Sequence, residues 1–195
     1  MGGNNSNLSL GQQVVIWAQG KVGKKVGKGE CWDLAEAALK QAGAQTSNDL
    51  GPVGDDSDYV WGDSIAIKDV EPGDVLQFRD YEVKTTTVTK YVWDDGSSET
   101  IESEDIAERG HHTAIVNGMP DSNGVVNTLD QRVKPLGKVV QNKRLHTRNL
   151  PAATRSSTSK RKHPGTKKLE SVKVKTTVTI EVSGQVWAYR PKAKQ

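Results

Sequence analysis

The feature that most constrains this 195-residue sequence is a strong amphipathic helix near the N-terminus, in the segment ECWDLAEAALKQAG that begins at Glu30. Leucine and alanine recur there at helical spacing, so the helix has one apolar face, and Gly43 follows as a typical helix end. A shorter helix is predicted after Ser9, because Ser9 and Gln12 have the spacing of a capping box. Two helices early in the chain therefore each have an apolar face that later segments must cover.

The later segments have patterns typical of β-strands separated by turns. A Pro-Gly turn precedes a predicted strand over 75–78, and the turn sequence PDSNG separates two more. The further strands are predicted over residues 112–119, 125–130, 138–145, 172–182 and 186–189. Helices first and antiparallel strands afterwards indicate an α+β fold.

Two stretches exceed what a minimal domain requires. Residues 81–93 alternate threonine with valine and run into the turn sequence DDG, so residues 81–102 are predicted to form a β-hairpin insertion. Residues 148–170 are rich in Ser, Thr and Lys, which predicts a basic flexible loop. The length suits one core, so residues 1–195 are predicted to form a single domain that carries both additions.

The net charge of +3 hides an asymmetry along the chain. Residues 1–131 contain 10 Lys and Arg against 22 Asp and Glu, whereas residues 132–195 contain 17 against 2. Residues 132–168 contain no carboxylate, which suggests an acidic partner for this basic segment. They also contain almost no aromatic side chain on which bases could stack, and this argues against nucleic acid.

Composition restricts the compartment and the chemistry. No apolar run approaches the length needed to span a bilayer, and the polar start has no signal core, so we expect a cytoplasmic protein. Cys31 is the only cysteine, which excludes an internal disulfide and a cysteine-rich zinc site. We expect neither a cofactor nor a metal.

Cys31 lies in the first turn of the predicted helix, where the helix dipole favours a thiolate. The N–H groups of that turn have no acceptor within the helix, so they could help to stabilise an oxyanion. The ordinary alternative is that a lone cysteine on an apolar helix is a small buried hydrophobic residue.

A nucleophilic thiol needs a base, and the chain has four candidates: His111, His112, His146 and His163. Strand alternation puts His112 on the same face as the small Ala114, which leaves room beside the imidazole. If the following hairpin turns about Asp121, Asp130 is the cross-strand partner of His112 and could orient its ring. A shift of register would substitute Gln131 or a neighbour.

Three motifs in this order, GECWDLA, PGDVLQF and GHHTAIV, resemble those of the papain-like NlpC/P60 and CHAP cysteine hydrolases. The likeness is strongest to the BBC1/AIM3-type cysteine proteinase-fold domains, through GECWDLAE, YVWG, GDVLQFRD, HHTAIV and a closing YRP. It covers most of the chain. The resemblance implies N-terminal helices packed on an antiparallel, barrel-like sheet.

The same resemblance implies roles for individual residues. Cys31 would be the nucleophile and His112 the base. The LDQR segment stands where CHAP domains carry Glu-Gln-Asn, so Asp130 replaces the Glu, Gln131 matches and Arg132 departs from the Asn. Asp130 is therefore the expected orienting residue, with Gln131 as the alternative.

Two functions follow from this reading. The first is a cysteine peptidase or amidase that cleaves a peptide or amide bond through a thioester. The second is a non-catalytic protein-interaction module on the same fold, because the BBC1/AIM3-type domains it resembles occur in cytoskeleton-associated proteins.

Overall fold

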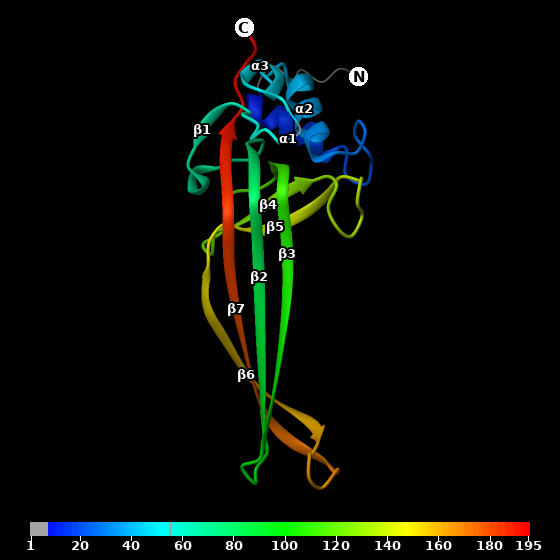
Figure 1. The fold of residues 1–195 in the computed structure, drawn as a ribbon, viewed down its shortest axis with the longest axis vertical. Coiled ribbons are helices and arrows are strands. Elements are labelled where there is room, and N and C mark those ends of the chain that lie inside the picture. Colours follow the sequence, from blue (N-terminus) through cyan, green and yellow to red (C-terminus); the bar gives the residue numbers. More distant parts are fainter. Residues whose placement is uncertain (1–7, 55) are drawn as a thin grey trace. The chain divides into compact units, whose positions relative to one another are not determined.

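The computed structural model describes residues 8–54 and 56–195 (Figure 1). The helices are α1 (Leu10–Gln19), α2 (Cys31–Ala42), α3 (Ser47–Leu50) and the 3-10 helix η1 (Ile67–Asp69). The strands are β1 (Asp63–Ile65), β2 (Val75–Val92), β3 (Ser98–Val116), β4 (Val125–Asp130), β5 (Gln141–His146), β6 (Leu150–Lys162) and β7 (Leu169–Arg190). The fold is thus a mostly antiparallel sheet with a few helices, in agreement with the α+β prediction.

The sheet is open, so the predicted barrel-like closure is wrong. Its strands follow the order β1-β7-β2-β3-β4-β5, with β6 paired to β7 outside this path. β1 is three residues long and pairs with the end of β7, from Asp63↔Arg190 to Ile65↔Ala188. Among the described residues no pairing joins β1 to β5 at the other end.

The chain divides into two compact units. The first contains the described part of residues 1–81 together with residues 109–147 and 183–195, and the second contains residues 82–108 and 148–182. β2, β3 and β7 each supply residues to both units. The prediction that residues 1–195 form a single domain stays a prediction.

Both N-terminal helices form as the sequence predicts. The Gln12 N–H donates to the Ser9 hydroxyl at 3.2 Å, and the Ser9 N–H donates to the Gln12 side chain at 2.8 Å, so the predicted capping box is confirmed. α2 begins at Cys31 and ends at Ala42, and the C-cap residue Gly43 has a φ of 71°, which is the left-handed conformation.

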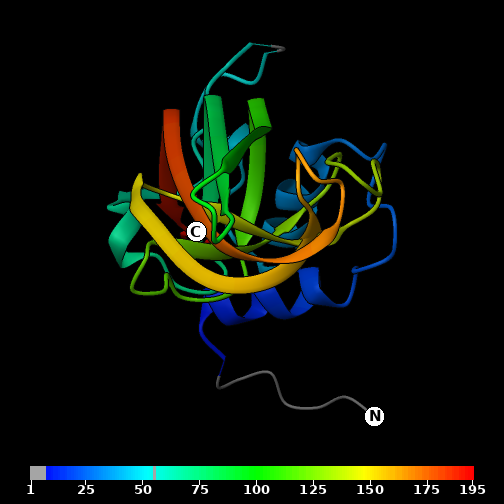
Figure 2. The same ribbon diagram turned by 90° about the horizontal axis from the view of Figure 1, so that it is seen from below.

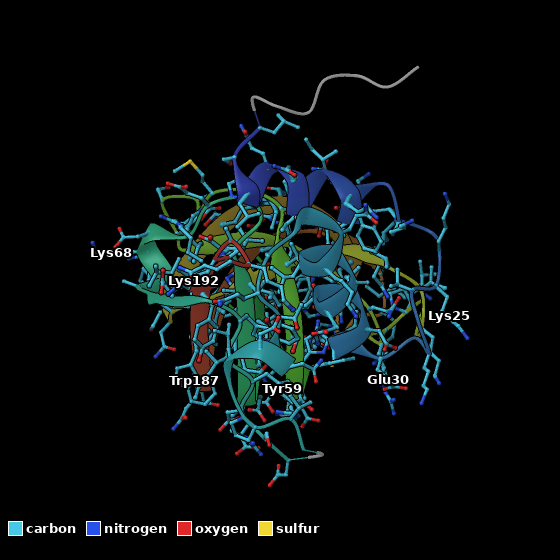
Figure 3. The ribbon with its side chains drawn as sticks, turned by 90° about the horizontal axis from the view of Figure 1, so that it is seen from above. Lys25, Glu30, Tyr59, Lys68, Trp187 and Lys192 are labelled. Atoms are coloured by element: carbon cyan, nitrogen blue, oxygen red, sulfur yellow. The ribbon has the colours of Figure 1, made fainter. Side chains whose placement is uncertain are left out.

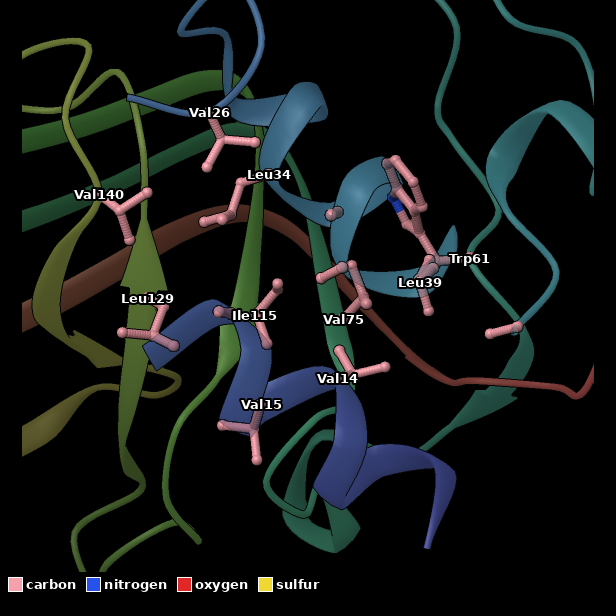
Figure 4. Close-up of a cluster of buried hydrophobic side chains, with 14 of the residues drawn as sticks. Val14, Val15, Val26, Leu34, Leu39, Trp61, Val75, Ile115, Leu129 and Val140 are labelled. Atoms are coloured by element: carbon pink, nitrogen blue, oxygen red, sulfur yellow. The ribbon is translucent and has the colours of Figure 1, made fainter. Parts of the chain in front are cut away.

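The core of the first unit lies between these helices and the sheet (Figure 4). α1 and α2 contribute apolar side chains from one face each, and β2, β3 and β4 contribute side chains that point toward them. The buried cluster includes Val14, Val15, Leu34, Leu39, Trp61, Val75, Ile115 and Leu129. This packing fixes the start of α2 against the sheet.

The second unit corrects the prediction for residues 148–170. Its residues Leu150–Lys162 form β6, which pairs with β7 in antiparallel register from Leu150↔Ile180 to Lys162↔Leu169 (Figures 1 and 2). Nearly every side chain of β6 is exposed, so the segment has the polar composition of a solvated loop. Its backbone is nevertheless paired with that of β7. The two strands predicted over 172–182 and 186–189 are one continuous strand, β7.

Among the described residues, no helix combines the length and the apolar character that a membrane crossing requires.

Candidate active site

Cys31 is the first residue of α2. The N–H of Glu30, the residue before it, donates to the Asp33 carboxylate at 2.9 Å, which closes the first turn of the helix. Cys31 itself is partly exposed. The predicted position of the thiol at the positive end of the α2 dipole is therefore present in the structure.

His112 comes from β3 and is 5% exposed, and Asp130 ends β4 and is fully buried. The His112 Nε2 atom lies 2.7 Å from Asp130 Oδ1. Since a carboxylate accepts, Nε2–H is the donor, and this leaves Nδ1 for the thiol. The imidazole is thus held between a carboxylate and a sulfur.

The predicted register of the β3–β4 hairpin is wrong by two residues. Asp130 pairs with Ala114, so His112 lies diagonally across from Asp130 rather than directly opposite it. Because strand side chains alternate with a period of two, a shift of two residues keeps both side chains on one face. The contact survives because diagonal neighbours are within reach of a histidine.

The sulfur of Cys31 and the ring of His112 share a hydrogen bond, and each alters the pKa of the other. Burial raises the pKa of the Cys31 thiol, but His112 and the N–H groups of Thr113 and Trp32 lower it more, so the net shift is downward. Burial lowers the pKa of His112, yet Asp130 and Cys31 raise it to about 9. These contacts therefore favour a thiolate beside an imidazolium over the neutral pair.

Asp130 has two further contacts that the sequence reading missed. The Thr128 hydroxyl donates a short hydrogen bond to Asp130 Oδ2, and the Arg109 guanidinium lies 3.9 Å from Asp130 Oδ1. The i, i+2 spacing of Thr128 and Asp130 on one strand face was a usable signal. Arg109, far away in the sequence, carried no such signal.

Gln131 does not lie beside His112 in the role considered for it. Its side-chain N–H donates to the Glu30 carbonyl at 2.7 Å and the Val26 carbonyl at 3.0 Å, and its oxygen accepts from the Val26 N–H at 2.8 Å. Gln131 therefore ties the loop before α2 to the end of β4. It fixes the backbone that leads to Cys31, whereas Asp130 contacts the imidazole.

The buried side-chain amide of Gln77 holds β3 in position. Gln77 is fully buried, and its oxygen accepts from the Thr113 hydroxyl at 2.8 Å and from the Trp61 indole at 3.2 Å. Thr113 in turn presents its N–H to the Cys31 sulfur. These contacts link the YVWG and GDVLQF motifs to the cysteine.

A cleft of about 600 Å³ opens at Cys31. His111 lines it, with Nε2 2.7 Å from the Ser57 carbonyl and its ring 5.2 Å from that of Tyr59. The other lining residues are Lys28, Glu30, Trp32, Asp33, Val53, Gly54 and Arg132. Cys31 thus lines an open cleft at the start of α2.

The remaining histidines do not join this site. His146 ends β5, where burial lowers its pKa, and His163 belongs to the second unit, where it contacts Asp95 and Ser97 at 3.0 Å each. No cluster of potential metal-binding side chains occurs in the part of the chain that the structure describes.

A thiol at a helix N-terminus, an imidazole from the sheet and a carboxylate behind it form the arrangement of cysteine proteinase-type sites. Comparison with known families agrees with this class. The model of the AIM3/BBC1 cysteine proteinase-fold domain matches residues 4–195, and the chain belongs to this family.

One curated relative is Altered inheritance of mitochondria protein 3 of Debaryomyces hansenii, which is 57% identical over 30 residues. The match covers 15% of this chain and 3% of that protein, so the chain corresponds to a very small part of its relative. No solved structure matches the chain significantly.

Proposed function

We propose that this domain is a cysteine hydrolase, a peptidase or amidase, with Cys31 as nucleophile, His112 as base and Asp130 as the residue that orients the imidazole. The observation that carries the proposal is the unbroken chain of contacts from Cys31, which lines the cleft, to His112 and then to the buried Asp130. A buried histidine that bonds a carboxylate on one side and a thiol on the other has the arrangement required for acyl transfer.

The reaction proceeds in two steps. The Cys31 thiolate attacks the carbonyl carbon of the substrate, and the C–N bond breaks as the His112 imidazolium gives its proton to the leaving amine. Neutral His112 then takes a proton from water, whose oxygen attacks the thioester. The C–S bond breaks, the carboxylic acid leaves, and the proton returns the pair to its starting state.

Charge balance supports this cycle. His112 with a pKa of about 9 is protonated at neutral pH, so it can serve as the acid of the first step. Asp130 compensates the buried imidazolium, and Thr128 and Arg109 hold Asp130 in place. The Cys31 N–H, in the first turn of α2, is a candidate donor to the oxyanion.

Alkylation of Cys31 by iodoacetamide as a function of pH tests the proposal without knowledge of the substrate. We expect the wild-type rate to rise at a lower pH than that of an ordinary cysteine, because the thiol pKa is lowered, and to fall at least tenfold at pH 7 in His112→Ala. Cys31→Ala identifies the labelled residue by mass spectrometry. A slow thiol whose rate does not depend on His112 would remove the hydrolase proposal.

The second candidate is a non-catalytic interaction module, favoured by the charged strands of the second unit. β3 residues 98–108 contain five carboxylates and no cation, and β6 residues 150–162 contain four cations and no carboxylate. Most of these side chains are exposed. An alkylation rate of Cys31 that is the same in His112→Ala as in the wild type, together with a bound partner that is not cleaved, would favour this module.

A further inference from the structure

Two lysine-bearing loops lie side by side next to Cys31. Residues 21–30 precede α2 and residues 131–140 follow β4, and a parallel bridge joins Val22 to Val140. The Gly23 N–H donates to the Val140 carbonyl at 2.9 Å, and the Val140 N–H donates to the Lys24 carbonyl at 2.9 Å. With the bonds from Gln131 to Val26 and Glu30, these contacts hold both loops together along their length.

A glycine permits the close contact of Lys138 with the first loop. Gly29 has a φ of 91°, and a Cβ atom there would lie 2.7 Å from the Cβ of Lys138. Lys138 therefore packs directly over the backbone that leads into Cys31. The cations of the second loop are thereby brought to the first.

The two loops have an excess of positive charge. Residues 21–30 contain four lysines and one carboxylate, Glu30, and residues 131–140 contain three cations and no carboxylate. We call the exposed side chains Lys24, Lys25, Lys28, Arg132 and Lys138 the basic rim. Lys28 and Arg132 also line the cleft that opens at Cys31, so the basic rim borders the candidate active site directly.

The carboxylates at the head of α2 offset only part of this charge. Glu30 forms an ion pair with Arg132 and lies 3.5 Å from Lys138, while Asp33 accepts the Glu30 N–H and packs against Gly27. Figure 3 shows Lys25 and Glu30 on the same side of this unit. The five exposed cations of the basic rim thus stand against two partly exposed carboxylates, Glu30 and Asp33, which line the cleft together with Lys28 and Arg132.

We infer that the basic rim is a docking surface for an acidic segment of a polypeptide, which it holds next to the bond to be cleaved. This inference rests on the proposed hydrolase function. Acidic side chains gain from the surplus of Lys and Arg, and the cleft that the rim borders leads to a thiol whose chemistry requires a carbonyl carbon.

Charged and neutral alkylating reagents measure the field of the basic rim at Cys31. Iodoacetate and iodoacetamide attack by the same chemistry, so the ratio of their rates cancels changes in the thiolate fraction. We expect the ratio of the iodoacetate rate to the iodoacetamide rate to fall roughly fivefold in the double variant Lys28→Gln/Arg132→Gln. The same ratio should fall with added NaCl in the wild type. Glu30→Gln is expected to change the ratio in the opposite direction.

The matched control removes two exposed lysines from other elements of the same unit, in Lys40→Gln/Lys68→Gln. Its ratio is expected to equal that of the wild type. An equal ratio in the wild type and in Lys28→Gln/Arg132→Gln would overturn the inference, because the rim would then exert no field at the thiol.

Binding identifies the partner class. A fluorescent octaglutamate peptide is titrated onto the full chain carrying Cys31→Ala, beside an octaglutamine peptide and a single-stranded oligonucleotide of equal charge. We expect the octaglutamate peptide to bind most tightly and to lose roughly tenfold in affinity when Lys28 and Arg132 are replaced by glutamine. Tighter binding of the oligonucleotide, or equal binding of both peptides, would overturn the inference.

Failure of this inference and failure of the proposed function remain distinguishable. The iodoacetamide rate in His112→Ala reports on the Cys31–His112 pair alone, and the reagent ratio reports on the basic rim alone. If alkylation slows in His112→Ala as expected, but the reagent ratio is the same in the wild type and in Lys28→Gln/Arg132→Gln, the hydrolase proposal stands and the docking surface is excluded.

Discussion

Replacement of Asp130 by asparagine keeps the shape of the side chain and removes its charge. Asp130 lies 2.7 Å from the His112 ring and is fully buried, so no water compensates for the lost charge. The pKa of His112 stands at about 9 against an ordinary value of 6.5, although burial, the largest influence, lowers it. The variant should therefore let the His112 pKa fall to 6.5 or below.

The size of the effect follows from that difference. The shift from 6.5 to about 9 amounts to about 3 kcal/mol, at about 1.4 kcal/mol per pKa unit. Since this pKa is raised by folding, its stabilising effect is present in full below pH 6.5 and is lost as the pH rises through about 9. Asp130→Asn should accordingly reduce the free energy of unfolding by about 3 kcal/mol at pH 6 and by less at pH 10.

Two measurements check this prediction. Urea denaturation at pH 6 and pH 10 gives the stability difference, and the iodoacetamide rate at pH 7 should drop at least tenfold because a neutral His112 no longer favours the thiolate. Asp63→Asn is the control, since Asp63 is an exposed carboxylate paired with Lys192. Equal pH dependence of stability in wild type and Asp130→Asn, with an unchanged alkylation rate, would refute the reasoning.

Three further predictions follow from particular contacts. Gln131→Ala removes three hydrogen bonds to the loop before α2 and should destabilise the domain by about 2–4 kcal/mol in urea denaturation, with slower alkylation of the thiol; unchanged values would show that the loop is fixed elsewhere. Gly73→Ala places a Cβ atom 1.9 Å from a backbone oxygen and should cost more than about 3 kcal/mol, whereas Gly43→Ala, with open space around it, should cost about 1–2 kcal/mol, and equal losses would contradict the geometry. His163→Ala removes the contacts between the two turns of the second unit and should speed amide hydrogen exchange in the β2–β3 turn without altering the alkylation rate.

Local patterns in the sequence determined the positions of α1 and α2 and the strand face on which His112 lies. The capping box at Ser9, the apolar face of α2 and the glycine at its end depend on neighbouring residues only, so each was readable from spacing. The face on which His112 lies was also readable, because strand alternation needs no knowledge of the partner strand.

Tertiary structure decided what depends on residues distant in the sequence. The two-residue register shift between β3 and β4, the pairing of β6 with β7 and the open edges of the sheet all depend on which strands meet, and local patterns do not record this. Arg109 joins Asp130 only because β3 and β4 are neighbours in the sheet. The sequence by itself thus specified which side chains could do chemistry, and long-range packing decided which of them came into contact.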